Sequence, residues 1–363
     1  MSRTLQPVAQ NSQRPDVMKG GGMRFSVGYQ LPGEDDDALV EIVADYLDHI
    51  TEVYFPWADQ PSGRAPLSTS HGYTDWTAQE RLEADLRAFR EMGIRLDLLF
   101  NANCYGGAAI SRRLANQVRS VIDHLGEVVG GVDVVTTTSP FVAHTIKSHY
   151  PDIEVRASVN MRLGTVIAMQ QMADLFDSYH VQRDYNRDLD HLAELKSWAD
   201  SAGKRLVMLA NSGCLAFCAG QSFHDNMVAH ECEIDAATNV TDWIPHTCWR
   251  LMRDPTNWPM LLQSTWVRPE DLHYYESLFD VVKLATRMHA RPRMVVDAYA
   301  RGVYRGNLLD LLEPGLGLAL APHLLDNQRF PADWFERTSR CDRRCHTCNY
   351  CAEVLEQVTV TVG

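Results

Sequence analysis

The sequence lacks the features that would place the protein in a membrane or on nucleic acid. No apolar run approaches the roughly 20 residues of a membrane-spanning helix, and the first residues contain no apolar core of a secretion signal. Positive charge is also scarce, since 47 acidic and 34 basic side chains give a formal net charge of −13. A polyanion needs a basic surface. We therefore expect a cytoplasmic protein with no membrane partner, for which nucleic acid is an unfavoured partner unless a local basic groove exists.

Several catalytic and cofactor motifs are missing as well. No G-x-G-x-x-G turn follows the first predicted strand, which argues against a dinucleotide-binding fold. The sequence contains no H-E-x-x-H motif, and no Ser, His and Asp order stands out. These absences disfavour zinc-metalloprotease and serine-protease chemistry.

From Met23 onward, short apolar runs alternate with amphipathic helical stretches. The predicted strands are MRFSVGYQ, TEVYFPW, RLDLLFNAN, VDVVTTTSP, IEVRASVN, DSYHVQRD, KRLVMLANS and FDVVKLAT. Eight such units favour a parallel (β/α)8 TIM-type barrel over a doubly wound sheet. We expect residues 1–22 to be a disordered leader, 23–306 to form the barrel with a cysteine-rich loop at 211–250, and 307–363 to form a cysteine-rich C-terminal extension.

Cysteine, by contrast, is plentiful, and eight of the nine cysteines fall into two sets of four. The first set follows the seventh predicted strand, on the rim where such barrels build active sites. The second set has the spacing C-x3-C-x2-C-x2-C near the end of the chain. The two sets are Cys214, Cys218, Cys232 and Cys248, and Cys341, Cys345, Cys348 and Cys351. In the cytoplasm such groups are more often metal ligands or redox groups than disulfides.

We predict that the first set holds a [4Fe–4S] cluster and that the second set holds another. The step of four residues from Cys214 to Cys218 would place both thiols on one face of a helical turn. Zinc is the alternative at both sites, because four thiolates also suit a tetrahedral ion. The C-x3-C-x2-C portion also matches radical S-adenosylmethionine enzymes, but that motif normally follows the first barrel strand. Cys104, the remaining cysteine, is assigned no role: it could line the barrel mouth, but a lone cysteine is more often a small buried hydrophobe.

Three segments carry a resemblance to a known family. The first cysteine set ends in TCWR, FDVVKLATRMHARPRMVVDAYARGVY joins a strand lysine to a loop arginine, and WVRPEDLHYYESL precedes that block. Together they resemble the collagenase-like peptidases (peptidase family U-thirty-two), which are better regarded as iron–sulfur barrel proteins. Ala285 and Thr286 stand where that family has an acidic residue and a glycine. The resemblance implies a [4Fe–4S] cluster in the barrel and oxygen-independent hydroxylation of small aromatic precursors or RNA bases.

Polar side chains at strand ends are the candidates for substrate and proton handling. Arg183 and Asp184 end the sixth predicted strand, and Lys283 and Arg287 match the lysine and arginine of the family block. Arginines such as Arg183 and Arg287 can hold a carboxylate or phosphate through two hydrogen bonds. The alternative for each of the four is a structural role at the rim.

These observations predict an iron–sulfur enzyme of redox type. It would hydroxylate or otherwise convert a small-molecule substrate at the barrel mouth without molecular oxygen, served by an electron donor or partner protein. An RNA-modifying, base-hydroxylating enzyme is the first alternative, and a zinc-binding hydrolase or peptidase-like protein is the second. A cysteine held as a cluster ligand is unavailable as a nucleophile, which disfavours the peptidase label that travels with the family.

Overall fold

The computed structural model describes residues 22–33, 37–57, 60 and 75–362. The leader predicted for residues 1–22 lies outside the described residues, apart from Gly22. The side chain of Cys232 is likewise outside the description, although its backbone belongs to a helix.

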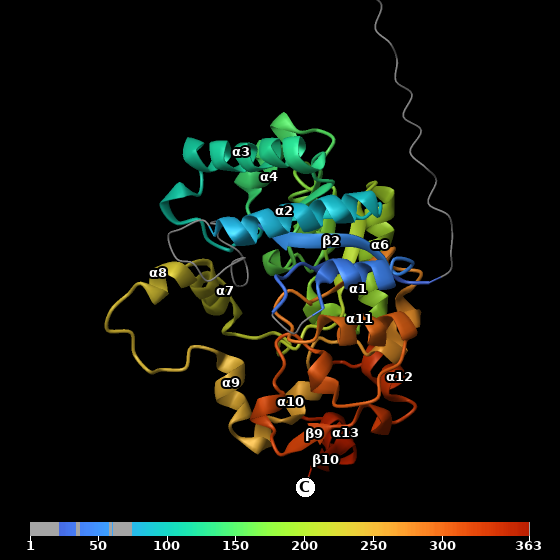
Figure 1. The fold of residues 1–363 in the computed structure, drawn as a ribbon. Coiled ribbons are helices and arrows are strands. Elements are labelled where there is room, and N and C mark those ends of the chain that lie inside the picture. The colour runs from blue at the N-terminus through green and yellow to red at the C-terminus, as the bar shows by residue number, and fades with distance from the viewer. Residues whose placement is uncertain (1–21, 34–36, 58–59, 61–74, 363) are drawn as a thin grey trace, which may run out of the picture.

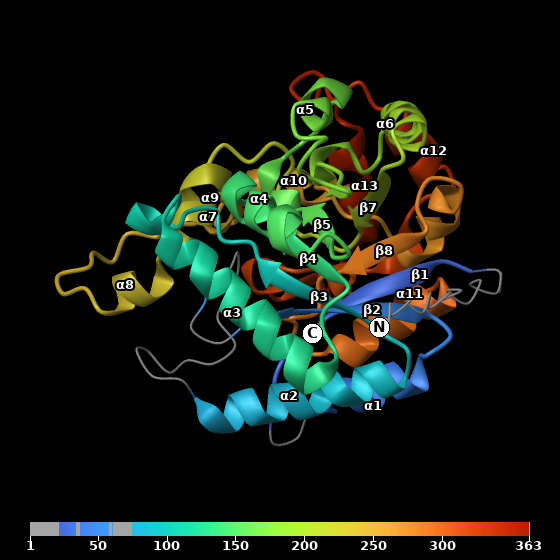
Figure 2. The same ribbon diagram turned by 90° about the horizontal axis from the view of Figure 1, so that it is seen from above.

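Eight parallel strands, hydrogen-bonded in sequence order, close into a barrel in which β8 pairs with β1. Figures 1 and 2 show the helices arranged around this cylinder. The strands are β1 (Arg24–Gly28), β2 (Ile50–Pro56), β3 (Arg95–Phe100), β4 (Val134–Thr137), β5 (Glu154–Ala157), β6 (Ser178–His180), β7 (Arg205–Leu209) and β8 (Val281–Leu284). The predicted (β/α)8 architecture is confirmed, and each strand lies within the apolar run that predicted it except β2, which begins one residue earlier, at Ile50.

Helices fill the connections between strands, and local sequence signals fix their ends. Ser111 caps α3 by accepting a hydrogen bond from the Leu114 N–H, and Gly130 ends that helix at a φ of 76°. The barrel helices are α1 (Leu39–Asp45), α2 (Trp76–Glu91), α3 (Arg112–Val129), α4 (Pro140–His149), α5 (Val166–Gln170), α6 (Leu189–Ser201) and α11 (Pro292–Arg301). Of the helices described, none is both long and apolar enough to cross a bilayer.

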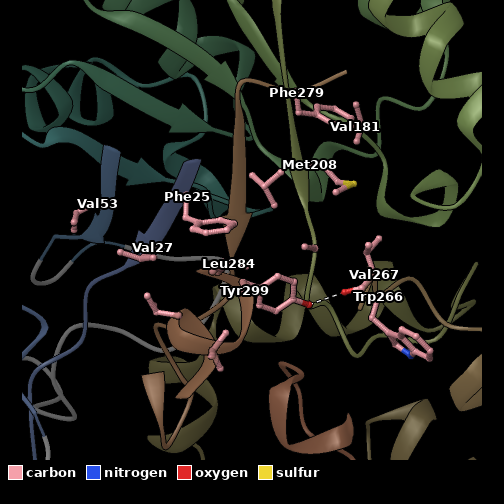
Figure 3. Packing of buried hydrophobic residues seen from close by; sticks show 14 of the residues in the cluster. Phe25, Val27, Val53, Val181, Met208, Trp266, Val267, Phe279, Leu284 and Tyr299 are labelled. Carbon is pink, nitrogen blue, oxygen red and sulfur yellow. Dashed lines mark hydrogen bonds between the residues drawn. The ribbon is translucent and has the colours of Figure 1, made fainter. Parts of the chain in front are cut away.

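The apolar core lies between the strands and these helices. Phe25, Val27 and Leu284 are all buried where the strands meet α11, and Figure 3 shows Tyr299 of α11 beside them. The Tyr299 hydroxyl donates to the Val267 carbonyl at 2.6 Å, so its polar end is satisfied within the core.

The barrel interior is polar instead. Arg156 of β5 donates to Glu52 of β2 at 2.6 and 3.0 Å, and these strands are not neighbours, so the contact crosses the lumen. Glu154 and Ser178 lie in the same network, where Arg156 donates to them at 3.1 Å each. Because Glu154 and Ser178 are the first residues of their strands, the network lies toward the N-terminal end of the barrel.

The connection after β7 leaves the barrel and returns. It contains α7 (Gln221–Ala229), α8 (Glu231–Asp235), α9 (Thr247–Met252) and α10 (Pro259–Leu262), with α8 on the part that projects furthest from the strands (Figures 1 and 2). Cys214 and Cys218 lie in turns before α7, so the expected helical turn carrying both thiols is wrong. The five residues between Cys214 and Cys218 inclusive contain Phe217 at a positive φ of 49°, which a helix does not accommodate.

Residues 307–362 pack against this connection. The extension contains β9 (His323–Leu325), α12 (Trp334–Ser339), α13 (Tyr350–Val358) and β10 (Thr359–Thr361), and β9 and β10 pair antiparallel. The Gly213 N–H donates to the Glu313 carbonyl at 3.0 Å, and the Glu313 N–H donates to the Asn211 carbonyl at 3.0 Å. These bonds fasten the extension to the chain as it leaves β7, beside α10 (Figure 1).

Candidate functional site

A cavity of about 390 Å³ opens at the C-terminal rim of the barrel. Its wall comes from the turn after β6, the connection after β7, α10 and the C-terminal extension. The lining residues are Arg183, Asp184, Arg187, Leu215, Ala216, Phe217, Cys218, Ala219, Thr247, Leu251, Met260, Leu262, Gln263, Ser264, Thr265, Thr338, Cys341, Arg343, Cys345 and Cys351. Thiols from both cysteine sets therefore face one space, although more than 120 residues separate Cys218 from Cys341.

Three cysteines of the first set, Cys214, Cys218 and Cys248, lie close to one another, and Cys218 lines this cavity. Cys218 and Cys248 are half-buried and pack on the hydrophobic core, and Cys214 is half-buried too. Burial raises the pKa of the Cys248 thiol, and the nearby charges of Cys214 and Cys218 raise it further. The three thiols are thus close enough to repel one another as thiolates.

In the second set, too, burial and neighbouring thiols raise the pKa of a cysteine. Cys341, Cys345 and Cys348 are exposed, whereas Cys351 on α13 is half-buried. Burial and the neighbouring thiolates raise the pKa of Cys351 to about 11, although Arg187 acts in the opposite direction. The half-buried guanidinium of Arg187 beside this set would partly balance the negative charge of a thiolate-bound metal centre.

The donor chemistry of both sets fits an iron–sulfur cluster, because such clusters take thiolate ligands. Within the described part of the chain, however, no three or more Cys, His, Asp or Glu side chains are arranged so that they could hold a metal ion. The fourth thiol of the first set, on Cys232, is outside that part. Metal binding would have to draw the thiols together, as it does where a site is not preformed.

Arg187 is a lining residue that the sequence did not single out. It donates to the Leu262 carbonyl at 2.9 Å and to the Ser264 carbonyl, and its guanidinium lies 5.1 Å from the ring centre of Trp266. The sequence signal that could have pointed to Arg187 is its spacing of four residues from Arg183. One turn of chain between them places both side chains at the same part of the rim.

Of the four catalytic candidates, Arg183 and Asp184 line the cavity. The Asp184 carboxylate accepts from the Phe217 N–H at 2.5 Å and from the Gln182 side chain at 2.8 Å. Asp184 therefore fixes Phe217, the residue with the positive φ, in the cavity wall. Arg183 is only 5% exposed.

Lys283 and Arg287 are not among the residues that line the cavity. The Lys283 Nζ lies inside the barrel, 3.7 Å from the centre of the Tyr54 ring. Burial lowers the pKa of Lys283, although Asp97 favours its charged form. Burial in turn raises the pKa of Asp97 against the effect of Arg156. The four candidates thus divide between the rim cavity and the β8 side of the barrel.

Cys104 is partly exposed, so it is not the small buried hydrophobe that a lone cysteine more often is. The Gly106 N–H donates to its sulfur at 3.3 Å, and a hydrogen bond with His230 lowers the pKa of the thiol. The sequence could not show this contact, because it joins the loop after β3 to the end of α7.

The chain is a (β/α)8 barrel with a cavity at its C-terminal rim, which is where enzymes of this fold have their active sites. No family model matches the sequence. The chain is 25% identical over 282 residues to an uncharacterized protease of Methanocaldococcus jannaschii, covering 77% of this chain and 81% of that protein. The solved structure of a U32 peptidase shares the fold with a TM-score of 0.52 and 16% identity, covering 76% of this chain and 98% of that one. A glycoside hydrolase family 5 mannosidase from Rhizomucor miehei matches with a TM-score of 0.41 and 10% identity, over 73% of this chain and 82% of that one.

The sequence relative and the shared fold confirm the resemblance to the U32 peptidases, the collagenase-like family that the sequence segments pointed to.

Proposed function

We propose that the protein is an iron–sulfur enzyme of redox type that converts a small molecule in the rim cavity, by hydroxylation or a related reaction without molecular oxygen. The observation that supports this is the opening of thiols from both cysteine sets into one cavity of about 390 Å³. Cavities of roughly 300–1,000 Å³ take small-molecule ligands. A substrate there would lie beside both proposed clusters.

The first cluster would be held by Cys214, Cys218, Cys232 and Cys248, and the second by Cys341, Cys345, Cys348 and Cys351. A bound cluster supplies electron transfer, and its reduction potential depends on nearby charge, hydrogen bonds and solvent exposure. The remaining work falls to the chain itself. Asp184 fixes the wall through the Phe217 N–H, and the apolar side chains of Leu215 and Leu262 exclude water from the bound substrate.

A zinc-binding hydrolase or peptidase is the second candidate, because the sequence relative is described as a protease. The described residues that line the cavity include several thiols but no histidine to act as a base. Since hydrolysis by a thiol requires such a base, the lining favours the redox proposal. RNA modification fits less well, because the walls are largely apolar and the net charge is −13.

Anaerobic purification with iron, sulfide and zinc analysis tests the proposal. We expect a brown protein with about eight irons per chain if both sets hold cubes. Cys218→Ser and Cys345→Ser should each lower the iron content to about half, and Cys104→Ser is the matched control that should leave it unchanged. Stoichiometric zinc without sulfide would contradict the redox proposal and favour the hydrolase.

A further inference from the structure

Arg183 is a buried cation for which the described residues provide no partner. It lies in the turn Arg183–Tyr185 directly after β6, is 5% exposed and lines the cavity. Its guanidinium makes no hydrogen bond or ion pair with any residue that the structure describes. Because a charge removed from water without a partner is strongly unfavourable, this position calls for an anion from outside the chain.

The other charged residues that line the cavity already make hydrogen bonds within the protein. Arg187 donates to two backbone carbonyls, and Arg343 donates to Asp188 at 2.7 Å. Asp184, the one carboxylate among the described lining residues, accepts from the Phe217 N–H. Arg183 is therefore the cation that remains available to a ligand.

The surroundings of Arg183 define the rest of the ligand. Leu215, Leu251, Met260 and Leu262 contribute apolar wall to the same cavity. A molecule that fills this space must therefore pair a hydrophobic body with one anionic group. A free inorganic ion would leave the apolar wall without contacts.

We propose that the substrate is a small, largely apolar molecule carrying one oxyanion, a carboxylate or a phosphate, which Arg183 binds through paired N–H donors. This inference rests on the proposed function in that it names the substrate class of the same cavity. The apolar body lies against the leucines, and the oxyanion ends at the turn after β6.

Calorimetric titration of the purified protein tests this with three matched probes: phenylacetate, its neutral amide phenylacetamide, and phenyl phosphate. We expect an acid to bind at least about tenfold more tightly than the amide, because a hydrogen bond to a charged group is worth that much. Tighter binding of phenylacetate assigns the oxyanion as a carboxylate, and tighter binding of phenyl phosphate assigns it as a phosphate.

Arg183→Gln should weaken binding of the favoured acid about tenfold to a hundredfold and leave the amide unchanged. Arg183→Lys should recover part of the loss, because it keeps the charge but not the fork of donors. Arg343→Gln is the matched control, since this arginine lines the same cavity but is paired with Asp188. Equal binding of acid and amide, or an acid that binds Arg183→Gln as tightly as the wild type, would overturn the inference.

The outcomes separate this inference from the proposed function. Iron analysis of the same preparations should give equal iron in the wild type and Arg183→Gln. If acids bind through Arg183 to a protein that takes up no iron, the redox proposal fails and the ligand class stands. If the iron is present and no acid binds, the ligand class fails and the redox proposal stands.

Discussion

The two ends of the barrel hold buried arginines in opposite situations. Arg156, 2% exposed, is surrounded by carboxylates: Glu52 at 2.6 Å, Glu154 at 3.1 Å and Asp97 at 3.5 Å. Arg183, 5% exposed, has no such partner among the described residues. The first cation completes a closed network near the N-terminal ends of the strands, whereas the second faces a cavity at the C-terminal rim. Buried charge therefore stabilises the fold at the N-terminal end of the barrel, and at the other end it is the proposed binding group for an anionic ligand.

Removing the paired arginine should have the largest effect. Arg156→Met leaves several carboxylates buried without their cation, so we expect it to lower the free energy of unfolding by about 3–5 kcal/mol. Urea unfolding followed by circular dichroism measures this. Arg95→Met is the control, because Arg95 is one-third exposed and shares the same carboxylates. If Arg156→Met lowers the free energy of unfolding no more than Arg95→Met does, Arg156 is not the central cation of the buried network.

Arg187 is intermediate, since its partners are backbone carbonyls rather than carboxylates. Arg187→Met would leave the Leu262 and Ser264 carbonyls without a donor, at a cost of about 1–3 kcal/mol in unfolding free energy. Arg187→Gln keeps hydrogen-bond donors and should lose less. Denaturant titration of the two variants checks the order, and equal losses would show that the carbonyl contacts contribute little.

The closed network should also appear in the pH dependence of stability. Burial alone would raise the pKa of Glu154, but Arg156, Arg95 and Arg205 outweigh it and lower the pKa to about 2. The ionised form is thus favoured in the folded state, so this contribution to stability is present above a pH of about 4.3 and is lost as the pH falls toward 2.

Glu154→Gln should therefore reduce the slope of unfolding free energy against pH between about 2 and 4 by up to about 1.4 kcal/mol per pH unit. Urea midpoints measured across that range give the slope. Glu336→Gln, on the exposed surface of α12, is the control and should keep the wild-type slope. An unchanged slope in Glu154→Gln would mean that Glu154 titrates normally.

The smallest effect is expected at Arg183. Without ligand, Arg183→Met removes a buried charge that no described side chain balances, so stability should change by no more than about 0.5 kcal/mol or should increase. Thermal and urea unfolding of the ligand-free protein measure this. A loss similar to that of Arg156→Met would reveal a partner within the chain and remove the contrast between the two ends.

Only part of the predicted site lines the rim cavity. The prediction from the sequence placed Arg183, Asp184 and Lys283 together as rim residues, although only Arg183 and Asp184 end a predicted strand and Lys283 lies inside one. In the structure Lys283 is the third of the four residues of β8, and its side chain turns into the lumen beside Tyr54. A shift of one residue along a strand reverses the side that a side chain faces, and apolar runs do not locate strand ends that finely.

The cysteine sets show a different limit. Their residue types and spacing are visible in the sequence, and so is the preference for thiolate-bound metal. Their approach to one cavity was not predicted, because it depends on the Glu313 carbonyl accepting from the Gly213 N–H and on α13 packing against α10. Such contacts between distant segments leave no periodic signal.

The eight-stranded barrel could be predicted from the sequence alone, and so could the presence of two groups of thiols near its C-terminal rim and C-terminus. Alternating strands and helices specify the fold because each element must bury an apolar face, and this requirement repeats locally along the chain. Which cations are paired depends on the folded arrangement: Arg156 donates to a glutamate 104 residues away, whereas Arg183 has no carboxylate partner among the residues that the structure describes. Pairing across the barrel depends on its closure, and no local pattern encodes that distance.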